Sequence, residues 1–169
     1  FSRRKRIPYI IEAFCRHPIS SKARLVLIGD GPEKPRIQAA IARCDNIGSV
    51  ELVGRTEDLS VIRSHLGGQS IILAPFQAGL SVVTGLSLGY PVGALRNAIS
   101  GGEIQNIIDG YNGKRATKLE YLLDWACFVL SNEESYARNS NNAQRYYRQN
   151  LSPNTFVRTY LDAIEKVAQ

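Results

Sequence analysis

The chain has 169 residues, and its hydrophobic fraction of 44% suits one globular domain with a core and excludes a disordered chain. The mean hydropathy is -0.17, and no apolar run approaches the roughly 20 residues that a membrane-spanning helix needs. The formal charge of +6 admits nucleic acid, an anionic membrane surface or a phosphorylated small molecule as a partner. Aromatic residues interleaved with base-reading side chains are not evident, which argues against nucleic acid.

The cysteines give little sign of a cross-link or a metal site. Cys15, Cys44 and Cys127 are widely spaced and form no CxxC pair, so neither a disulfide framework nor a zinc site is indicated. We expect all three to be small buried residues in a reducing compartment, the cytoplasm. No Asp/His cluster is present, and the sequence therefore predicts no metal.

The first part of the chain predicts alternating helices and strands. We expect a helix over residues 7–17, a buried strand over 24–28, and a second helix that contains Ile37. A strand over 50–53 follows, and Thr56 is expected to cap the next helix.

The stretch from residue 70 to residue 92 predicts the centre of the fold. Residues 71–74 show no polar–apolar alternation, which is typical of a parallel strand covered on both faces. A turn ending at Gly79 leads into a helix over 80–88, and a second strand covers 91–95. Such a turn leaves backbone N–H groups free to bind a phosphate, but a plain βαβ crossover explains the same residues.

The last part of the chain is predicted to be mostly helical. A short helix over 103–108 and an extended piece over 114–116 come first, followed by helices over 117–130, 133–149 and 155–167. This order predicts an α/β domain: a Rossmann-like, doubly wound parallel sheet with helices closing its C-terminal end. We expect residues 1–169 to form a single domain.

Glycines follow three of the predicted strands, at Gly29, Gly54 and Gly79, and a Gly101-Gly102 pair comes later. The carboxyl ends of parallel strands lie at one edge of a sheet, where ligands bind. The glycines therefore predict one crevice for a nucleotide-type ligand, although glycines also end strands that bind nothing. No G-x-G-x-x-G or phosphate-loop motif identifies the ligand.

Five segments occur in a recognisable order: KRIPYIIEAF, LVLIGDGPEKPRI, VELVGRTEDL, the central stretch with LGYPV, and SGGEIQNIIDGYNG. Together they resemble the C-terminal domain of family-4-like glycosyltransferases (glycosyl transferases group 1) of the GT-B fold. The resemblance extends over about residues 3–113. It implies one half of a GT-B fold, which binds a nucleotide-sugar donor, whereas a separate N-terminal domain binds the acceptor.

The resemblance also implies roles for individual residues. Lys5 matches the lysine of the family's K-G segment and is expected to contact the donor diphosphate. The turn at Gly54 resembles the loop that passes the base, and the turn at Gly79 resembles the amide cradle for the diphosphate. The candidate donor-binding residues are Lys5, Gly54, Arg55, Gly79, Leu80, Ser81, Thr84 and Glu103.

The central stretch departs from the family at a pair of glutamates, one near the transferred sugar and one near the ribose. Counting back without gaps from Gly89, those positions hold Phe76 and Thr84, and an alignment on Gly79 puts Ala78 at the first. Threonine can hydrogen-bond a ribose hydroxyl but cannot act as a carboxylate. No catalytic residue is therefore assigned. The stretch GLSVVTGLSLGYPV looks more like a branch common among polysaccharide-assembly enzymes.

The function implied by the resemblance is a retaining glycosyl transfer from a UDP-, GDP- or other nucleoside-diphosphate sugar to a glycan or lipid-linked acceptor, without a cofactor. A non-catalytic GT-B-like binding or assembly domain is the alternative, and a basic nucleic-acid module is a third. In the family an arginine on the first strand precedes the lysine, and that position falls before Phe1. We therefore expect a fragment that lacks the first strand and the acceptor domain and is inactive alone. The resemblance is compatible with peripheral association of the full-length protein with the inner face of the membrane.

Overall fold

The structure is a computed structural model that describes residues 1–167. Its strands form two sheets, and every neighbouring pair of strands is parallel. The first sheet consists of β1 (Leu25–Ile28) and β2 (Val50–Val53). The second has the order β3 (Ile72–Leu73), β4 (Val92–Leu95) and β5 (Gly113–Ala116). The predicted α/β class with parallel strands is confirmed, although the sheet is divided in two.

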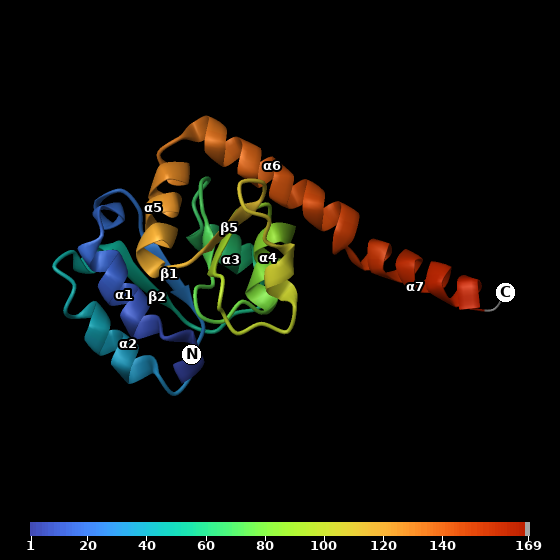
Figure 1. The fold of residues 1–169 in the computed structure, drawn as a ribbon. Coiled ribbons are helices and arrows are strands. Elements are labelled where there is room, and N and C mark those ends of the chain that lie inside the picture. The colour runs from blue at the N-terminus through green and yellow to red at the C-terminus, as the bar shows by residue number, and fades with distance from the viewer. Residues whose placement is uncertain (168–169) are drawn as a thin grey trace.

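Helices cover both faces of the second sheet (Figure 1). The side chain of Val92 points toward α4 (Leu80–Ser87), whereas the α-carbon of Gly93 faces α5 (Leu119–Leu130). Alternate residues of a strand point to opposite faces, so β4 is enclosed between these two helices. All four residues of β4 are buried. The full burial predicted for the run over residues 71–74 is not observed, since Ile72 and Leu73 of β3 are half-buried.

A second group of helices shares a core with the first sheet. The apolar stripe of α1 (Ile7–Arg16) packs with α2 (Lys34–Ile41), and both join α5 in one hydrophobic cluster that includes Leu27 of β1. Between β2 and β3 lies α3 (Leu59–His65), none of whose residues is buried.

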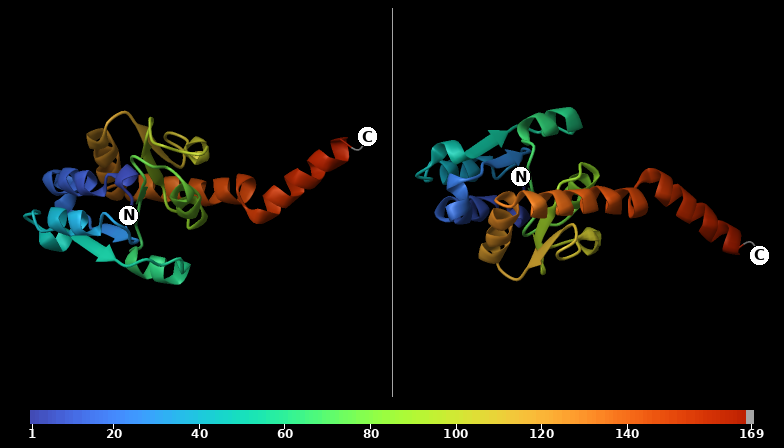
Figure 2. Two further views of the ribbon diagram at one scale, coloured as in Figure 1. Left: turned by 90° about the horizontal axis from the view of Figure 1, so that it is seen from below. Right: turned by 90° about the horizontal axis from the view of Figure 1, so that it is seen from above.

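The chain ends in two long helices. α6 (Glu133–Asn150) crosses α4, and α7 (Pro153–Val167) projects beyond the rest of the molecule, as Figures 1 and 2 show. α7 leaves several large apolar side chains exposed, namely Phe156, Val157, Tyr160, Leu161 and Ile164. None of the described helices combines the length and apolar character needed to cross a bilayer.

Three predicted elements differ from the structure. The predicted strand over 71–74 pairs only at Ile72 and Leu73, and the predicted helix over 103–108 is a 3-10 turn, η4 (Glu103–Asn106). Thr56 does not cap α3. Asp58 does so, because its carboxylate accepts a hydrogen bond from the N–H of Ser60 at 2.8 Å.

Gly85 and Gly113 mark places where elements approach closely. A Cβ atom at Gly85 would lie 2.8 Å from Val92 Cγ2 and 2.9 Å from Ile72 Cγ1, so glycine lets α4 lie close to the sheet. A Cβ atom at Gly113 would overlap the backbone oxygen of Val92, on the neighbouring strand. Because the contact between β4 and β5 at Gly113 is with the backbone of Val92, no side chain could move away to make room for a larger residue.

The cysteines contradict the prediction that all three are reduced. Cys15, near the end of α1, is joined to Cys44 by a disulfide, with a Cα–Cα distance of 5.7 Å. Cys127 is free and half-buried. The two cysteines are 29 residues apart in sequence, and only the packing of α1 against α2 brings them together.

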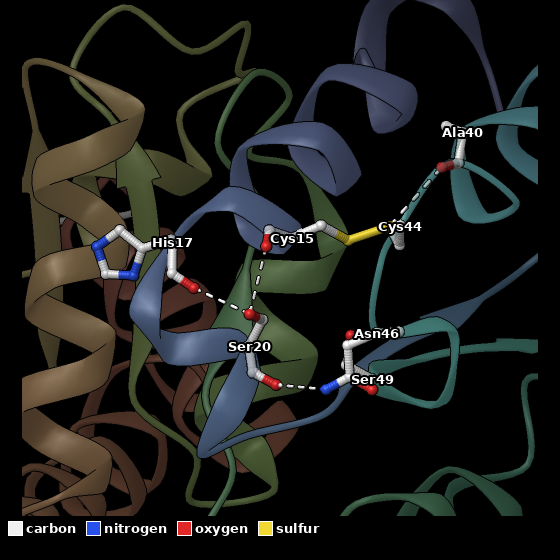
Figure 3. The surroundings of a disulfide bond; sticks show 7 residues. All are labelled: Cys15, His17, Ser20, Ala40, Cys44, Asn46 and Ser49. Atoms are coloured by element: carbon white, nitrogen blue, oxygen red, sulfur yellow. Dashed lines mark hydrogen bonds between the residues drawn. A yellow bond between two sulfur atoms is a disulfide. The ribbon is translucent and has the colours of Figure 1, made fainter.

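Hydrogen bonds surround the disulfide, as Figure 3 shows. The hydroxyl of Ser20 donates to the carbonyl of His17 at 3.0 Å, and the side-chain amide of Asn46 donates to the carbonyl of Ser20 at 3.3 Å. The first bond lies within the loop after α1, and the second joins that loop to the loop that contains Cys44. The disulfide therefore reinforces a contact that polar groups also make.

Thiol titration tests the disulfide. The unfolded, unreduced chain should show one reactive thiol, and three after reduction. Reduction should lower the free energy of unfolding by roughly 3 kcal/mol, because it releases a closed loop of this length. Cys127→Ala is the control and should leave the effect of reduction unchanged. Three reactive thiols before reduction would contradict the pairing of Cys15 with Cys44.

Gly113→Ala tests the contact between β4 and β5. Because the new methyl group would overlap the carbonyl of Val92, we expect the free energy of unfolding to fall by about 3 kcal/mol, measured by urea denaturation. Gly68→Ala is the matched control, since a Cβ atom there meets nothing within 4 Å. An equal loss in both variants would show that β4 and β5 do not approach as closely as described.

Candidate functional site

The carboxyl ends of β1 and β2 lie side by side. The N–H of Gly29, just after β1, donates to the carbonyl of Val53 at 3.3 Å and to that of Gly54 at 3.2 Å. The ammonium group of Phe1 donates to the carbonyl of Asp30, and the ring of Phe1 lies next to the α-carbon of Gly29. The start of the chain therefore lies against these two strand ends.

The same N-terminal segment also reaches the end of β3. The hydroxyl of Ser2 donates to the side-chain oxygen of Gln77 at 3.5 Å. The backbone of Ile99 exchanges two hydrogen bonds with this turn: its N–H donates to Phe76 and its carbonyl accepts from Ala78, both at 2.9 Å. The loops that follow β1, β2, β3 and β4 thus gather around residues 1–2 and the turn between β3 and α4.

A cavity of about 600 Å³ separates β1 from β3. Its walls are mostly apolar and include Val26 and Ile28 on one side and Ile71 and Leu73 on the other. Polar groups line both ends of the cavity: Lys5, Gln77 and Ser81 lie near the carboxyl ends of the strands, whereas Lys22, Arg24, His65, Gln69 and Ser70 lie toward the amino ends.

The backbone edges of the two sheets face this cavity. Ile72 donates its N–H group to the carbonyl of Pro91, just before β4, at 3.0 Å, and Ala74 donates to the carbonyl of Gly93 in β4 at 2.8 Å. Alternate residues of a strand direct their backbone groups to opposite edges, so those of Ile71 and Leu73 point away from β4. By the same rule, because Gly29 bonds to Val53, the backbone of Ile28 points away from β2. No strand within residues 1–167 pairs with these two edges.

The predicted diphosphate-binding residues lie at one end of the cavity. Lys5 ends the 3-10 turn η1 (Arg3–Lys5), is exposed, and lines the cavity together with Ser81. Gly79 is the N-cap residue of α4 and supplies no side-chain cap, so the first-turn N–H groups of α4 have no such partner. Leu80 is 76% exposed, and Thr84 is half-buried on the next turn, outside the lining.

Gly54 and Arg55 lie outside the cavity lining. Both are exposed, and the guanidinium of Arg55 pairs with the carboxylate of Glu57 at 2.9 Å. The two paired side chains are 77% and 82% exposed, and neither lines the cavity. The described geometry therefore brings Gly54 close to the gathered loops but leaves Arg55 directed to solvent.

Glu103 bonds within its own loop. Its carboxylate accepts hydrogen bonds from the hydroxyl of Ser100 at 3.0 Å and from the N–H of Gly101 at 2.8 Å. Its own backbone N–H, the hydroxyl of Ser100 and the N–H of Gly101 together lower the pKa of Glu103. The side chain thus fixes the Gly101-Gly102 turn beside the site.

Arg6 and Phe76 form a contact that the sequence does not reveal. The guanidinium carbon of Arg6 lies 5.1 Å from the centre of the Phe76 ring, whose other neighbour is Tyr9, with ring centres 5.9 Å apart. Arg6 follows Lys5 directly, and Phe76 lines the cavity. Within residues 1–167 no three His, Cys, Asp or Glu side chains gather as a metal site would require.

The sequence profile of the family described as glycosyl transferases group 1 matches residues 1–124. The chain belongs to this family. No curated protein matches the chain in sequence.

Solved structures show the same fold in glycosyltransferases. HepE of Anabaena, solved in complex with UDP, has a TM-score of 0.76 at 19% identity over 98% of this chain and 47% of its own. TarM of S. aureus has a TM-score of 0.78 at 19% identity, over 96% of this chain and 33% of its own. The C-terminal domain of LpcC from Francisella tularensis has a TM-score of 0.70 at 16% identity, over 90% of this chain and 83% of its own. The chain therefore has the fold of a GT-B C-terminal half and spans about half the length of HepE.

The sequence offers one signal that distinguishes Arg6 from the other basic residues. The resemblance aligns Lys5 with the lysine of a K-G segment, which would place Arg6 at the glycine, and Arg6 has a left-handed conformation with φ of 48°. An arginine in the place of a glycine is the signal, but the adjacent basic residues Arg3 and Arg4 make it look like an ordinary solvated charge.

The ionisation of Glu103 tests the loop geometry. Because hydrogen bonds lower the pKa of Glu103, they stabilise the loop above the ordinary pKa of glutamate, and this contribution disappears as pH falls through the lowered value. A carbon-detected NMR titration should give a low midpoint for Glu103. Ser100→Ala should move it upward, whereas Ser87→Ala should not. An ordinary midpoint in the unmodified chain would contradict the bonds to Ser100 and Gly101.

Proposed function

We propose that this chain is the donor-binding half of a glycosyltransferase that transfers a sugar from a nucleoside-diphosphate sugar. The observation that carries the proposal is that Lys5 and Ser81, which are far apart in sequence, line the same end of one cavity, near the carboxyl ends of the strands. The free N–H groups at the start of α4 carry partial positive charge, which favours a diphosphate.

The proposed chemistry uses these groups electrostatically. Glycosyl transfer passes through an oxocarbenium-like state as the diphosphate departs, and a nearby cation and backbone donors stabilise the developing negative charge. Lys5 supplies the cation and the turn at Gly79 to Ser81 supplies the donors. We propose retention of configuration as in the family, and leave the catalytic residue unassigned.

The donor we propose is a UDP-sugar. HepE has been solved with UDP-glucose and shares the fold, and WaaG, with a TM-score of 0.68, is involved in lipopolysaccharide biosynthesis. On this basis we propose a glycan or lipid-linked acceptor in polysaccharide assembly. The acceptor would bind to a separate domain, so we expect no turnover by residues 1–169 alone.

We also propose that a strand preceding Phe1 occupies the apolar part of the space between β1 and β3, and leaves the end that Lys5 and Ser81 line open to the donor. The two facing edges offer unpaired backbone groups at Ile28 and Leu73, and apolar side chains line the space between them. Phe1 lies at the carboxyl end of β1, where a strand parallel to β1 would end. Such a strand would join the two sheets into one and bring its own carboxyl end to the donor site.

A non-catalytic binding domain is the second candidate. The resemblance puts Phe76 or, in the other alignment, Ala78 at the first of the family's two carboxylate positions and Thr84 at the second, and Thr84 lies outside the cavity lining. A domain of this kind would keep the groups that bind the diphosphate, Lys5 and the turn at Gly79 to Ser81, but would transfer no sugar.

Calorimetric titration with UDP tests donor binding. We expect UDP to bind, and Lys5→Ala to weaken it about tenfold, because a charge-assisted contact to phosphate is lost. Arg3→Ala is the matched control, since it removes the same charge from the same 3-10 turn without touching the cavity lining. The absence of binding by UDP and GDP alike would refute the proposal. Binding without sugar transfer by the longer protein would favour the second candidate.

A further inference from the structure

Arg6 has a backbone conformation that suits it poorly. With φ of 48° and ψ of 37°, it is the one non-glycine residue with positive φ in the part of the chain that the structure describes. Its N–H donates to Arg3 at 3.2 Å, and its carbonyl accepts from Tyr9 at 3.1 Å and Ile10 at 3.2 Å. The surrounding turns therefore impose the conformation. Residues kept in such a conformation gather at functional sites.

The charge of Arg6 has no carboxylate partner among the ion pairs of residues 1–167, unlike the charges of Arg24 and Arg96. Its contact is instead the ring of Phe76, at 5.1 Å. An aromatic ring orients a guanidinium without neutralising it. The positive charge is therefore available to an external anion.

Arg6 and Phe76 lie beside the proposed diphosphate site, which consists of Lys5 and the turn at Gly79 to Ser81. Phe76 lines the cavity with Lys5 and Ser81 and belongs to the turn that ends at Gly79. Arg6 follows Lys5 in sequence and is the N-cap residue of α1. Arg6 does not itself line the cavity, and its guanidinium meets the lining at the ring of Phe76. A glutamate at position 76 would instead place a carboxylate against Arg6.

We propose that Arg6 is a second cation for the donor diphosphate and that Phe76 is a positioning residue for its guanidinium. The planar guanidinium offers paired N–H donors that match phosphate oxygens, whereas Lys5 offers a single point charge. This inference rests on the proposed donor-binding function. It gives the guanidinium of Arg6 a role that glycine, which would relieve the backbone, could not fill.

Two substitutions of Arg6 separate its charge from its backbone strain. Arg6→Ala and Arg6→Gly both remove the guanidinium, and each should weaken UDP binding about tenfold in calorimetry. Only Arg6→Gly relieves the left-handed conformation, so its melting temperature should exceed that of Arg6→Ala by roughly 2–8 °C. A more stable protein that binds UDP worse is the expected signature. Equal melting temperatures of the two variants would overturn the strain argument.

Phe76→Leu tests the positioning role. It keeps an apolar side chain but removes the ring, and UDP affinity should fall about twofold to fivefold, the range of an exposed cation–π contact. Uridine, which lacks phosphates, should bind all the variants as it binds the unmodified chain, as followed by NMR titration. An equal loss for uridine and UDP would make the role of Phe76 structural and overturn the proposal.

Arg4→Ala is the matched control for Arg6→Ala, because Arg4 is an exposed cation two residues away with no aromatic contact in the described structure. It should change UDP affinity less than twofold. If the unmodified chain binds UDP, and Arg4→Ala and Arg6→Ala bind it with equal affinity, the inference about Arg6 is wrong while the proposed function stands. If the unmodified chain binds no nucleotide, the proposed function itself fails.

Discussion

Because each pair of neighbouring strands is parallel, the chain must cross back over the sheet after every strand before it can pair again. This requirement puts the loops that follow β1, β2, β3 and β4 at one end of the molecule, where hydrogen bonds join them through residues 1–2, Gln77 and Ile99. The site depends on this arrangement more than on any single side chain. Close approach at Gly85 and Gly113 keeps the strands and α4 near enough for it to form.

The interior of the fold and its ligand-facing edge are built differently. β4 is buried throughout and covered by helices on both faces, and the disulfide from Cys15 to Cys44 joins α1 to the loop after α2. The edge instead consists of short turns fixed by local polar groups, as Asp58 fixes the start of α3 and Glu103 fixes the turn at Gly101. Such turns can carry exposed cations and free N–H groups because the rigid interior determines where they lie.

Much of the fold could be predicted from the sequence because helical spacing and unbroken apolar runs record burial directly. The stripe from Ile7 to Phe14 is an example. The apolar run over residues 71–74 is the exception, because its strand is half-buried and only one of its edges is paired within residues 1–167. The disulfide could not be predicted, because Cys15 and Cys44 have no characteristic spacing and only the packing of two helices brings them together. The cap of α3 was misplaced by two residues because Thr56 and Asp58 are both good caps, and sequence does not say which one the helix uses.

The candidate site was predictable as a set of turns but not as a set of side-chain contacts. Glycines after strands locate Gly54 and Gly79, yet Arg55 is directed away from the cavity by its pairing with Glu57, and Thr84 lies on the next turn of α4. The contact of Arg6 with Phe76 joins residues seventy positions apart by number, and nothing in either local pattern records it.

The most direct test of the central claim is an amide NMR titration of the chain with UDP. If the carboxyl ends of the strands form a diphosphate site, the largest chemical-shift changes should fall on the N–H groups of Gly79, Leu80 and Ser81 and on those of Lys5 and Arg6. Shifts should be small on α6 and α7, which lie away from the cavity lining. Perturbations confined to α7, or spread evenly over the basic surface, would contradict the account.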